Sequence, residues 1–142
     1  MFPSRSEYER FIYTINKNYP IVEKSTLHFF STSAAAGMLK GTIRFRNGLR
    51  LKVVEVIDFA ARQILDYSYT VYKGQHKITW YDSQPHPEAP DLAETFPHHK
   101  HVLPNIRKNR KPSADIGFDD LNLPKLIEEI GTFSSLSFPQ NL

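Results

Sequence analysis

Residues 39–53 alternate apolar and polar side chains on both sides of an Asn47-Gly48 pair, which is the pattern of a β-hairpin with one buried and one solvated face. A two-residue turn would put the arginines on the leucine face. A three-residue loop at 46–48 instead pairs Phe45 with Leu49, keeps the apolar rows together and gives Gly48 the positive φ that such a loop needs. We therefore predict this register, with five basic residues on the solvent face: Lys40, Arg44, Arg46, Arg50 and Lys52.

A second hairpin is expected over residues 64–82, turning at Gly74-Gln75. A two-residue turn there places three cross-strand pairs on one face, and aromatic and β-branched pairs of this kind are favourable. The pairs are Val71 with Ile78, Tyr69 with Trp80, and Tyr67 with Asp82. Asp82 then ends the last strand on the same side as Tyr67. With a further strand at residues 26–32, the segment 26–82 is predicted to form an antiparallel β-meander of about five strands.

An amphipathic helix is expected near each end of the chain. Over residues 6–19 the apolar side chains recur with helical spacing, Ser6 and Glu9 have the spacing of a capping box, and Pro20 ends the helix. A short helix over residues 122–131 starts at an asparagine cap and closes at a glycine. Both apolar stripes need a sheet to cover them, so both helices are predicted to pack on one face.

The remaining segments and the composition limit the class of protein. Residues 83–117 hold six of the ten prolines and are expected to form a loop, and residues 132–142 a tail. The 142 residues suit one α+β domain, over residues 1–142. The absence of cysteine excludes disulfides and thiolate metal sites, and no apolar run reaches the length of a membrane span, so a cytoplasmic protein without a membrane partner is expected.

The densest set of reactive side chains begins at the end of the second hairpin and continues into the proline-rich segment. Histidine is the side chain best suited to proton transfer near neutral pH, and a strand end that leads into a loop is a common place for a site. Glu55 continues the buried row if no bulge intervenes, which is unusual for a carboxylate; at a bulge it would face water. The candidate catalytic residues are Asp82, His86, His98, His99, His101, Tyr67 and Glu55.

One hypothesis for this set is cleavage of RNA without a metal ion or other cofactor. That reaction needs a base for the 2′-hydroxyl proton, an acid for the leaving 5′-oxygen and a cation for the charged phosphorane. His86 and one of the later histidines would exchange protons, with Asp82 orienting one imidazole. The net charge of +3 permits RNA as a partner without requiring it. The candidate nucleic-acid-binding residues are Arg44, Arg46, Arg50, Lys100, Arg107 and Lys108.

Other interpretations of the same residues stay open at this point. His98 and His101, with His86 and Asp82, offer nitrogen and oxygen ligands for a metal-dependent hydrolase, although the helical HExxH pattern is absent. The histidines can also shape the surface of a non-catalytic module that binds nucleic acid or a protein. Asp82 can simply accept backbone hydrogen bonds at a turn. The oligomeric state, monomer or homodimer, is open as well.

Two segments resemble a known family. Tyr67-Ser-Tyr69, followed by a hairpin and residues 80–87 with sequence Trp-Tyr-Asp-Ser-Gln-Pro-His-Pro, and residues 95–101 with sequence Thr-Phe-Pro-His-His-Lys-His, are similar to motifs of the TumE-type toxins. The match covers roughly residues 41–130. Ser83-Gln84 stands where an Asn-Ala pair is more usual, and Ala89-Pro90-Asp91 lengthens the loop.

The resemblance implies a toxin of a type II toxin–antitoxin module. Such a toxin is expected to act on RNA and to be held by a cognate antitoxin with a DNA-binding domain. The motif positions that carry over to this chain are Tyr67, Tyr69, Asp82, Pro85, His86, Pro97, His98, His99 and His101.

Overall fold

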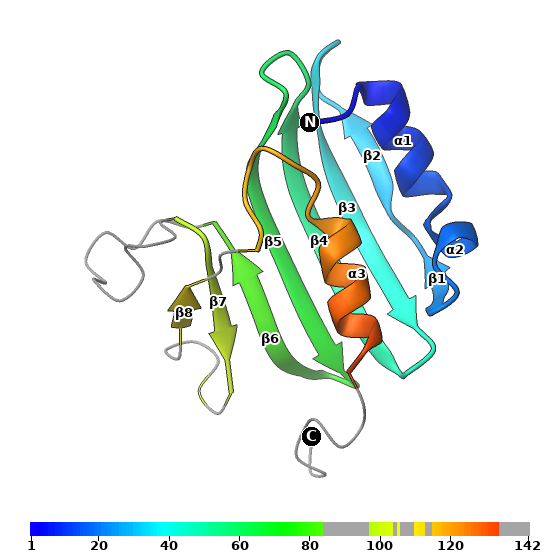
Figure 1. The fold of residues 1–142 in the computed structure, drawn as a ribbon, viewed down its shortest axis with the longest axis vertical. Helices are drawn as coiled ribbons and strands as arrows, with labels where there is room; N and C mark the ends of the chain where they lie inside the picture. Colours follow the sequence, from blue (N-terminus) through cyan, green and yellow to red (C-terminus); the bar gives the residue numbers. More distant parts are fainter. Residues whose placement is uncertain (84–96, 104, 106–109, 113–114, 134–142) are drawn as a thin grey trace.

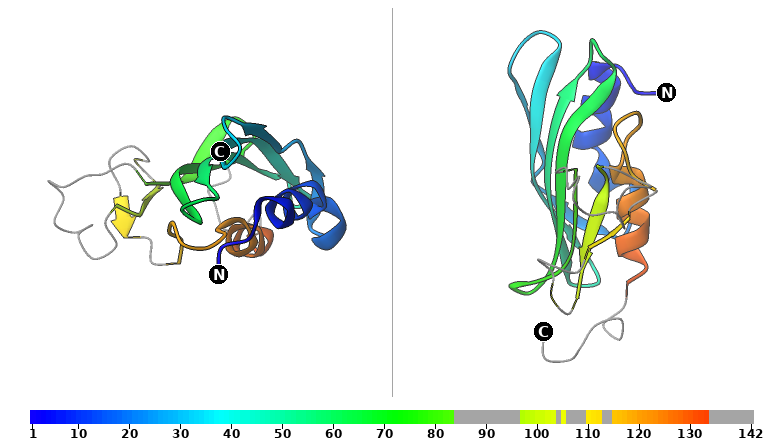
Figure 2. Two further views of the ribbon diagram at one scale, coloured as in Figure 1. Left: turned by 90° about the horizontal axis from the view of Figure 1, so that it is seen from above. Right: turned by 90° about the vertical axis from the view of Figure 1, so that its left-hand side faces the viewer.

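The computed structural model describes residues 1–83, 97–103, 105, 110–112 and 115–133. Its centre is one twisted antiparallel sheet, and the helices lie together on one of its faces (Figures 1 and 2). The strands follow the order β1-β3-β4-β5-β6-β7-β8, and β2 also pairs with β3. The opposite face of the sheet carries no helix in the part of the chain that the structure describes, and we call it the helix-free face.

The described residues form eight strands and three helices. The strands are β1 (Val22–Ser25), β2 (His28–Ser31), β3 (Ala36–Phe45), β4 (Leu49–Asp58), β5 (Gln63–Lys73), β6 (His76–Asp82), β7 (His99–Val102) and β8 (Arg110–Pro112). The helices are α1 (Arg5–Tyr13), α2 (Ile15–Asn18) and α3 (Leu123–Gly131). The predicted α+β class and antiparallel sheet are confirmed, with more strands than the five expected. No helix among these has the length and apolar character of a bilayer-spanning segment.

The hairpin of β3 and β4 has the predicted register. Arg44 pairs with Arg50, so the loop spans residues 46–48, and Gly48 has a φ of 90°. The Gly48 N–H donates to the Phe45 carbonyl at 3.1 Å, which closes this loop. Leu49, Leu51, Val53, Glu55 and Ile57 are all buried in one row, as the alternation predicts. Glu55 therefore does lie on the helix-covered face.

The hairpin of β5 and β6 departs from the predicted register because Ile78 is an extra residue in β6. The turn is the expected one, with Lys73 opposite His76, but beyond the bulge Thr70 pairs with Trp80 and Ser68 with Asp82. A shift of one residue moves every later side chain to the other face of a sheet. The prediction that Asp82 shares a face with Tyr67 is therefore wrong, and Asp82 and Trp80 belong to the helix-free face.

The segment expected to be an irregular loop at residues 83–117 contains two strands. β7 extends the sheet from β6, with Asp82 opposite His99 and Trp80 opposite His101, and β8 pairs with β7. Alternating burial in β7 comes from histidines rather than from apolar side chains. A hydrophobic pattern of period two, which is the usual sign of a strand, was therefore missing.

The N-terminal helix begins earlier than predicted. Ser4, not Ser6, is the cap: its hydroxyl accepts the Glu7 N–H, and the Glu7 carboxylate accepts the Ser4 N–H. The earlier start places Arg5 where it ion-pairs with Glu9 at 3.6 Å and lies 5.2 Å from the centre of the Phe29 ring. The helix is also interrupted after Tyr13, so that the predicted stretch 6–19 becomes α1 and α2.

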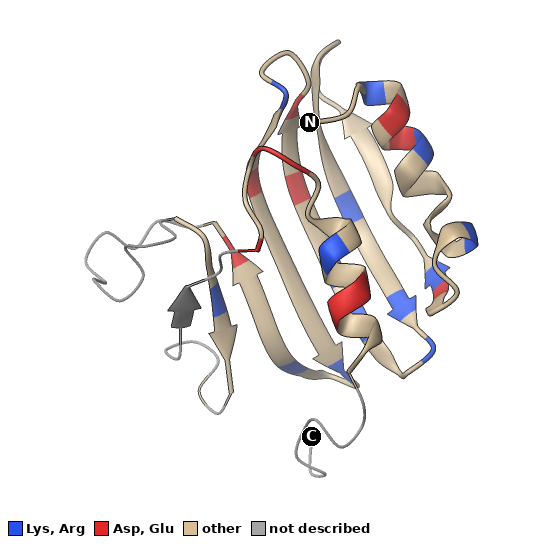
Figure 3. Ribbon diagram, in the orientation of Figure 1, with Lys and Arg blue, Asp and Glu red and all other residues tan. Residues whose placement is uncertain are grey.

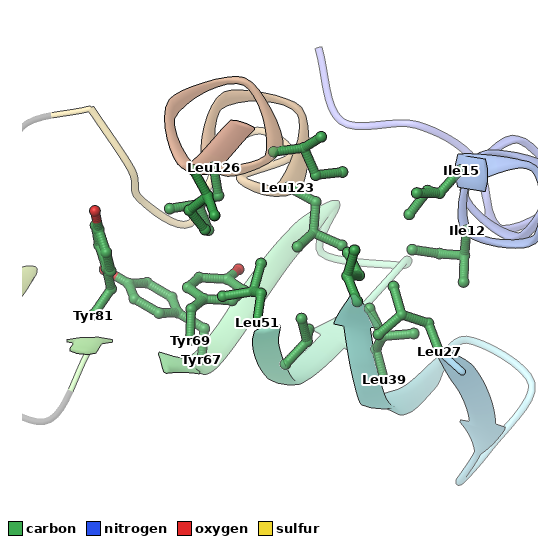
Figure 4. Packing of buried hydrophobic residues seen from close by; sticks show 14 of the residues in the cluster. Ile12, Ile15, Leu27, Leu39, Leu51, Tyr67, Tyr69, Tyr81, Leu123 and Leu126 are labelled. Carbon is green, nitrogen blue, oxygen red and sulfur yellow. The ribbon is translucent and has the colours of Figure 1, made fainter. Parts of the chain in front are cut away.

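α3 occupies the predicted position, but Asn122 does not cap it through its side chain. The Asn122 amide instead donates to the Tyr69 hydroxyl and to the Gly117 carbonyl, and its oxygen accepts the Gly117 N–H. The core lies between the sheet and the helices, with α1 and α2 over the β3 side and α3 over the tyrosines of β5 and β6 (Figure 4). Burying side chains such as Ile12 and Leu126 contributes about 1.5–3 kcal/mol each.

Candidate functional site

The sheet separates the predicted site residues into two groups. Asp82, His99 and His101 point to the helix-free face, because they occupy one side of the β6–β7 ladder together with Trp80. Tyr67, His98 and Glu55 lie on the helix-covered face. Lys100 belongs to this second group, since its Nζ lies 6.0 Å from the centre of the Tyr81 ring. His86, Arg107 and Lys108 lie outside the described residues.

Asp82, His99 and His101 form a compact cluster, which we call the Asp–His–His centre. His99 Nε2 lies 2.7 Å from Asp82 Oδ1, and His101 Nε2 lies 3.4 Å from Asp82 Oδ2. The two Nε2 atoms are 3.2 Å apart. All three residues are at most 5% exposed. Three polar groups thus meet at one point, where water screens their charges weakly.

A backbone carbonyl fixes which ring nitrogen of neutral His99 carries the hydrogen. His99 Nδ1 lies 3.1 Å from the Pro97 carbonyl oxygen. A carbonyl can only accept a hydrogen bond, so Nδ1 carries the hydrogen. In neutral His99 the Nε2 lone pair then points at Asp82 and His101. Its short contact with a carboxyl oxygen is satisfied by a hydrogen shared between Nε2 and Asp82 or by a bound metal ion.

A groove of about 190 Å³ adjoins the centre on the helix-free face. Trp80 connects the two: its ring stacks on His101 at 4.5 Å, and its Nε1–H donates to Ser68 Oγ at 2.8 Å. Lys77 Nζ lies 5.3 Å from the Trp80 ring centre. The groove is lined by Lys52, Val54, Ser68, Thr70, Tyr72, Lys77 and Trp80. It therefore combines aromatic surface with two lysines.

The predicted basic residues of the first hairpin lie on or beside this face. Lys40, Arg44 and Lys52 are exposed, and Figure 3 shows basic positions along β3 and in the turn after it. Arg50 Nη2 donates to the Gly74 carbonyl at 2.9 Å, and its guanidinium lies 4.8 Å from the Tyr72 ring centre. Arg46 sits in the turn, where its Nε donates to the Pro20 carbonyl. Arg50 therefore contacts the groove lining through Tyr72, whereas Arg46 contacts the chain before β1.

Glu55 is part of a buried hydrogen-bond network under the helices. The Tyr8 hydroxyl donates to Glu55 Oε1 at 2.7 Å, and the Tyr69 hydroxyl donates to Oε2. Burial raises the pKa of Glu55, and the two tyrosine hydrogen bonds oppose that rise. The same burial, beside the carboxylate, raises the pKa values of Tyr8 and Tyr69 well above their ordinary value. With 1% of its surface exposed, Glu55 joins α1, the sheet and the start of α3.

Tyr67 and His98 form a second contact on the helix-covered face. The Tyr67 hydroxyl hydrogen-bonds with His98 Nδ1 at 2.7 Å, and the two rings stack at 5.7 Å. Phe118 packs edge-on against His98 at 4.6 Å. Burial lowers the pKa of His98 and raises that of Tyr67. His98 also lines a cleft of about 310 Å³ in front of α3, on the other side of the sheet from the Asp–His–His centre.

Trp80, Ser68 and Lys77 were not singled out from the sequence as site residues. The expected regular hairpin put Trp80 on the buried face beside Tyr69, and the bulge moves it to the helix-free face. One signal in the sequence indicated that the register was open: residues 78–81 do not form one apolar and one polar row. Neither register of this hairpin is therefore favoured by the pattern alone.

The family model described as Toxin TumE matches residues 11–132, which is most of the chain. No curated protein and no solved structure matches it. The matched range contains both hairpins, β7, β8 and all of α3, and so includes every residue of the Asp–His–His centre.

Proposed function

We propose that this chain, which belongs to the TumE toxin family, is an endoribonuclease that uses the Asp–His–His centre on the helix-free face of its sheet. Membership of the family implies the toxin of a toxin–antitoxin pair, with an antitoxin as partner. RNA as the substrate is the proposal. The observation that carries it is the position of the centre beside a groove with lysines and aromatic rings, on the same face as the basic hairpin.

RNA would bind along the groove through charge and stacking. Single-stranded nucleic acid is commonly held by a positive surface that follows the phosphates and by aromatic rings on which bases stack. Lys52 and Lys77 supply the charge, and Trp80 and Tyr72 supply the rings. Cross-strand neighbours are about 5 Å apart, so the row from His101 through Trp80 and Thr70 to Lys52 extends about 15 Å from the centre.

Proton transfer would take place at His101 and His99. His101 contacts Trp80 and so stands between the groove and the rest of the centre. Asp82 accepts a hydrogen bond from protonated His99 and stabilises that charge. The short separation of the two Nε2 atoms lets one proton pass between the imidazoles, so the centre can give a proton to a leaving oxygen or take one from a hydroxyl. Lys77, in the groove lining, would stabilise the charge on phosphate.

The test is cleavage of a mixed RNA substrate by purified, antitoxin-free protein, with and without EDTA. We expect cleavage that persists in EDTA and falls by a factor of about 10² or more in His101→Ala and in His99→Ala. His76→Ala is the matched control, because His76 is exposed at the tip of the β5–β6 hairpin. Wild-type cleavage rates in both centre variants would overturn the proposal. Folded wild-type protein that binds RNA without cutting it would support a non-catalytic binding module instead.

A further inference from the structure

We propose that Asp82, His99 and His101 are also a binding site for one divalent transition-metal ion of the zinc class. Each of the three residues offers one ligand atom, and these atoms lie within 4.8 Å of one another. The metal site itself follows from ligand geometry alone. Its effect on RNA cleavage rests on the proposed function, and the experiment below separates the two.

The spacing of the ligand atoms suits tetrahedral coordination. Metal–ligand bonds of about 2.0–2.1 Å at tetrahedral angles separate neighbouring ligand atoms by about 3.3 Å. The two histidine Nε2 atoms are 3.2 Å apart, and His101 Nε2 is 3.4 Å from Asp82 Oδ2. The contact between His99 Nε2 and Asp82 Oδ1, at 2.7 Å, is shorter. A small rotation of the carboxylate is therefore the main change that metal binding requires.

The hydrogen bond behind His99 is of the kind that supports metal ligands. A ligating histidine usually donates its other ring N–H to a carbonyl or carboxylate, which fixes the tautomer and turns the remaining ring nitrogen toward the metal. His99 Nδ1 donates in this way to the Pro97 carbonyl. His101 stacks on Trp80 with an angle of 20° between the rings. Both imidazoles are thus oriented before any ion arrives.

The three ligands lie on two paired strands. Asp82 and His99 are direct partners in the β6–β7 ladder, and His101 lies two residues further along the same face of β7. Sites on paired strands keep their geometry better than sites on loops. The low exposure of all three side chains also protects bound metal from exchange with water.

The ligand types decide which class of metal the site selects. Two imidazole nitrogens and one carboxylate oxygen suit zinc, cobalt, nickel and copper, whereas magnesium and calcium prefer sites built from oxygen. Three protein ligands is the number found in catalytic zinc sites, where water takes the fourth position. An ion here would occupy both Nε2 lone pairs and the carboxylate. Metal-free proton transfer uses the same atoms, so zinc should suppress that reaction.

The experiment uses the full chain after removal of metal with EDTA and dialysis. Zinc is titrated by calorimetry, cobalt by its visible absorption, and the melting temperature is followed with each metal. We expect one ion per chain, a tetrahedral cobalt spectrum and a higher melting temperature. His99→Ala, His101→Ala and the isosteric Asp82→Asn should each lower the affinity about tenfold or more, since even outer-shell changes cost that much. His98→Ala, one residue away but on the other face of the sheet, is the matched control.

Three outcomes would overturn the metal site: folded wild-type protein that binds neither ion, binding that persists in all three centre variants, or binding that His98→Ala abolishes. RNA cleavage is measured in parallel. Loss of cleavage in zinc and its recovery in EDTA would support both the site and its effect. Zinc binding by a protein that never cleaves RNA would overturn the proposed function alone. Cleavage that requires zinc would keep the metal site and overturn the metal-independent reaction.

Discussion

Replacing Tyr8 with phenylalanine measures how the fold retains a fully buried carboxylate. The substitution removes only the hydroxyl that donates to Glu55 Oε1 at 2.7 Å. The ring keeps its edge-on contacts with Phe29 and Phe59, at 5.6 Å and 5.5 Å. Because the deleted hydrogen bond goes to a carboxylate with 1% exposure, its removal should lower the free energy of unfolding by about 1.5–3 kcal/mol. For a chain of this size that is a fall of about 5–12 °C in melting temperature.

The same network predicts that Tyr69→Phe costs more than Tyr8→Phe. The Tyr69 hydroxyl donates to Glu55 Oε2 and accepts from the Asn122 amide, so its removal affects two buried partners. The double variant should deviate from the sum of the two single variants by about 0.5 kcal/mol or more, because both hydroxyls serve one carboxylate. RNA cleavage at a temperature where the variants are folded should be unchanged, since the network lies on the opposite face from the Asp–His–His centre.

The assay is urea unfolding followed by tyrosine and tryptophan fluorescence, with wild type and each variant compared at one pH. Tyr72→Phe is the matched control: it also removes one tyrosine hydroxyl, but from the helix-free face of the sheet. We expect a lower midpoint with an unchanged denaturant slope for the network variants and little change for the control. If Tyr8→Phe lowered the free energy of unfolding by less than about 0.5 kcal/mol, hydrogen bonds would not be what holds Glu55, and this reasoning would be refuted.

Three further changes probe charge, pH dependence and the second histidine site. Charge reversal at Arg44 and Lys52 should weaken RNA binding. It should also reduce the slope of log K against log salt concentration by about 0.7 for each phosphate that is no longer neutralised. Filter binding across salt concentrations measures both effects, and Lys17→Glu on α2 should show neither. Burial raises the pKa of Glu55, so at a pH between its ordinary and raised pKa the unfolded chain has released a proton that the folded chain keeps. The free energy of unfolding of the wild type should therefore fall with rising pH in this range, relative to that of Glu55→Gln. Parallel pH profiles of the two proteins in urea unfolding would contradict this. His98→Ala should cleave RNA at close to the wild-type rate while its free energy of unfolding falls by about 0.5–1.5 kcal/mol; failure of the folded variant to cleave would place His98 in the catalytic set.

The sequence was sufficient to predict strand pairing where the apolar pattern allowed a single register. In the β3–β4 hairpin, only a loop at 46–48 kept the apolar rows together, and the position of Glu55 followed from that. Two capping boxes overlap at the N-terminus, and local spacing cannot choose between them. The contact of Arg5 with the Phe29 ring is tertiary information.

The candidate site was predictable in its residue types but not in its geometry. Asp82, His99 and His101 were among the candidates, yet so were His98 and Tyr67, which the sheet holds on its other face. Two facts were missing from the pattern. One is the bulge at Ile78, which sets the side of Asp82. The other is that β7 is a strand, so that His99 and His101 share one face of the sheet and His98 lies on the other.

The division of the Asp–His–His centre between β6 and β7 has a consequence for the order of synthesis. Asp82 leaves the ribosome before His99 and His101, and at about 5–20 residues per second the delay is about 1–4 s. During that interval the groove residues from Lys52 to Trp80 already exist, but the histidines that complete the centre do not. Under the proposed function, a chain at this stage has the groove lining for charge and stacking but not yet the two histidines for proton transfer.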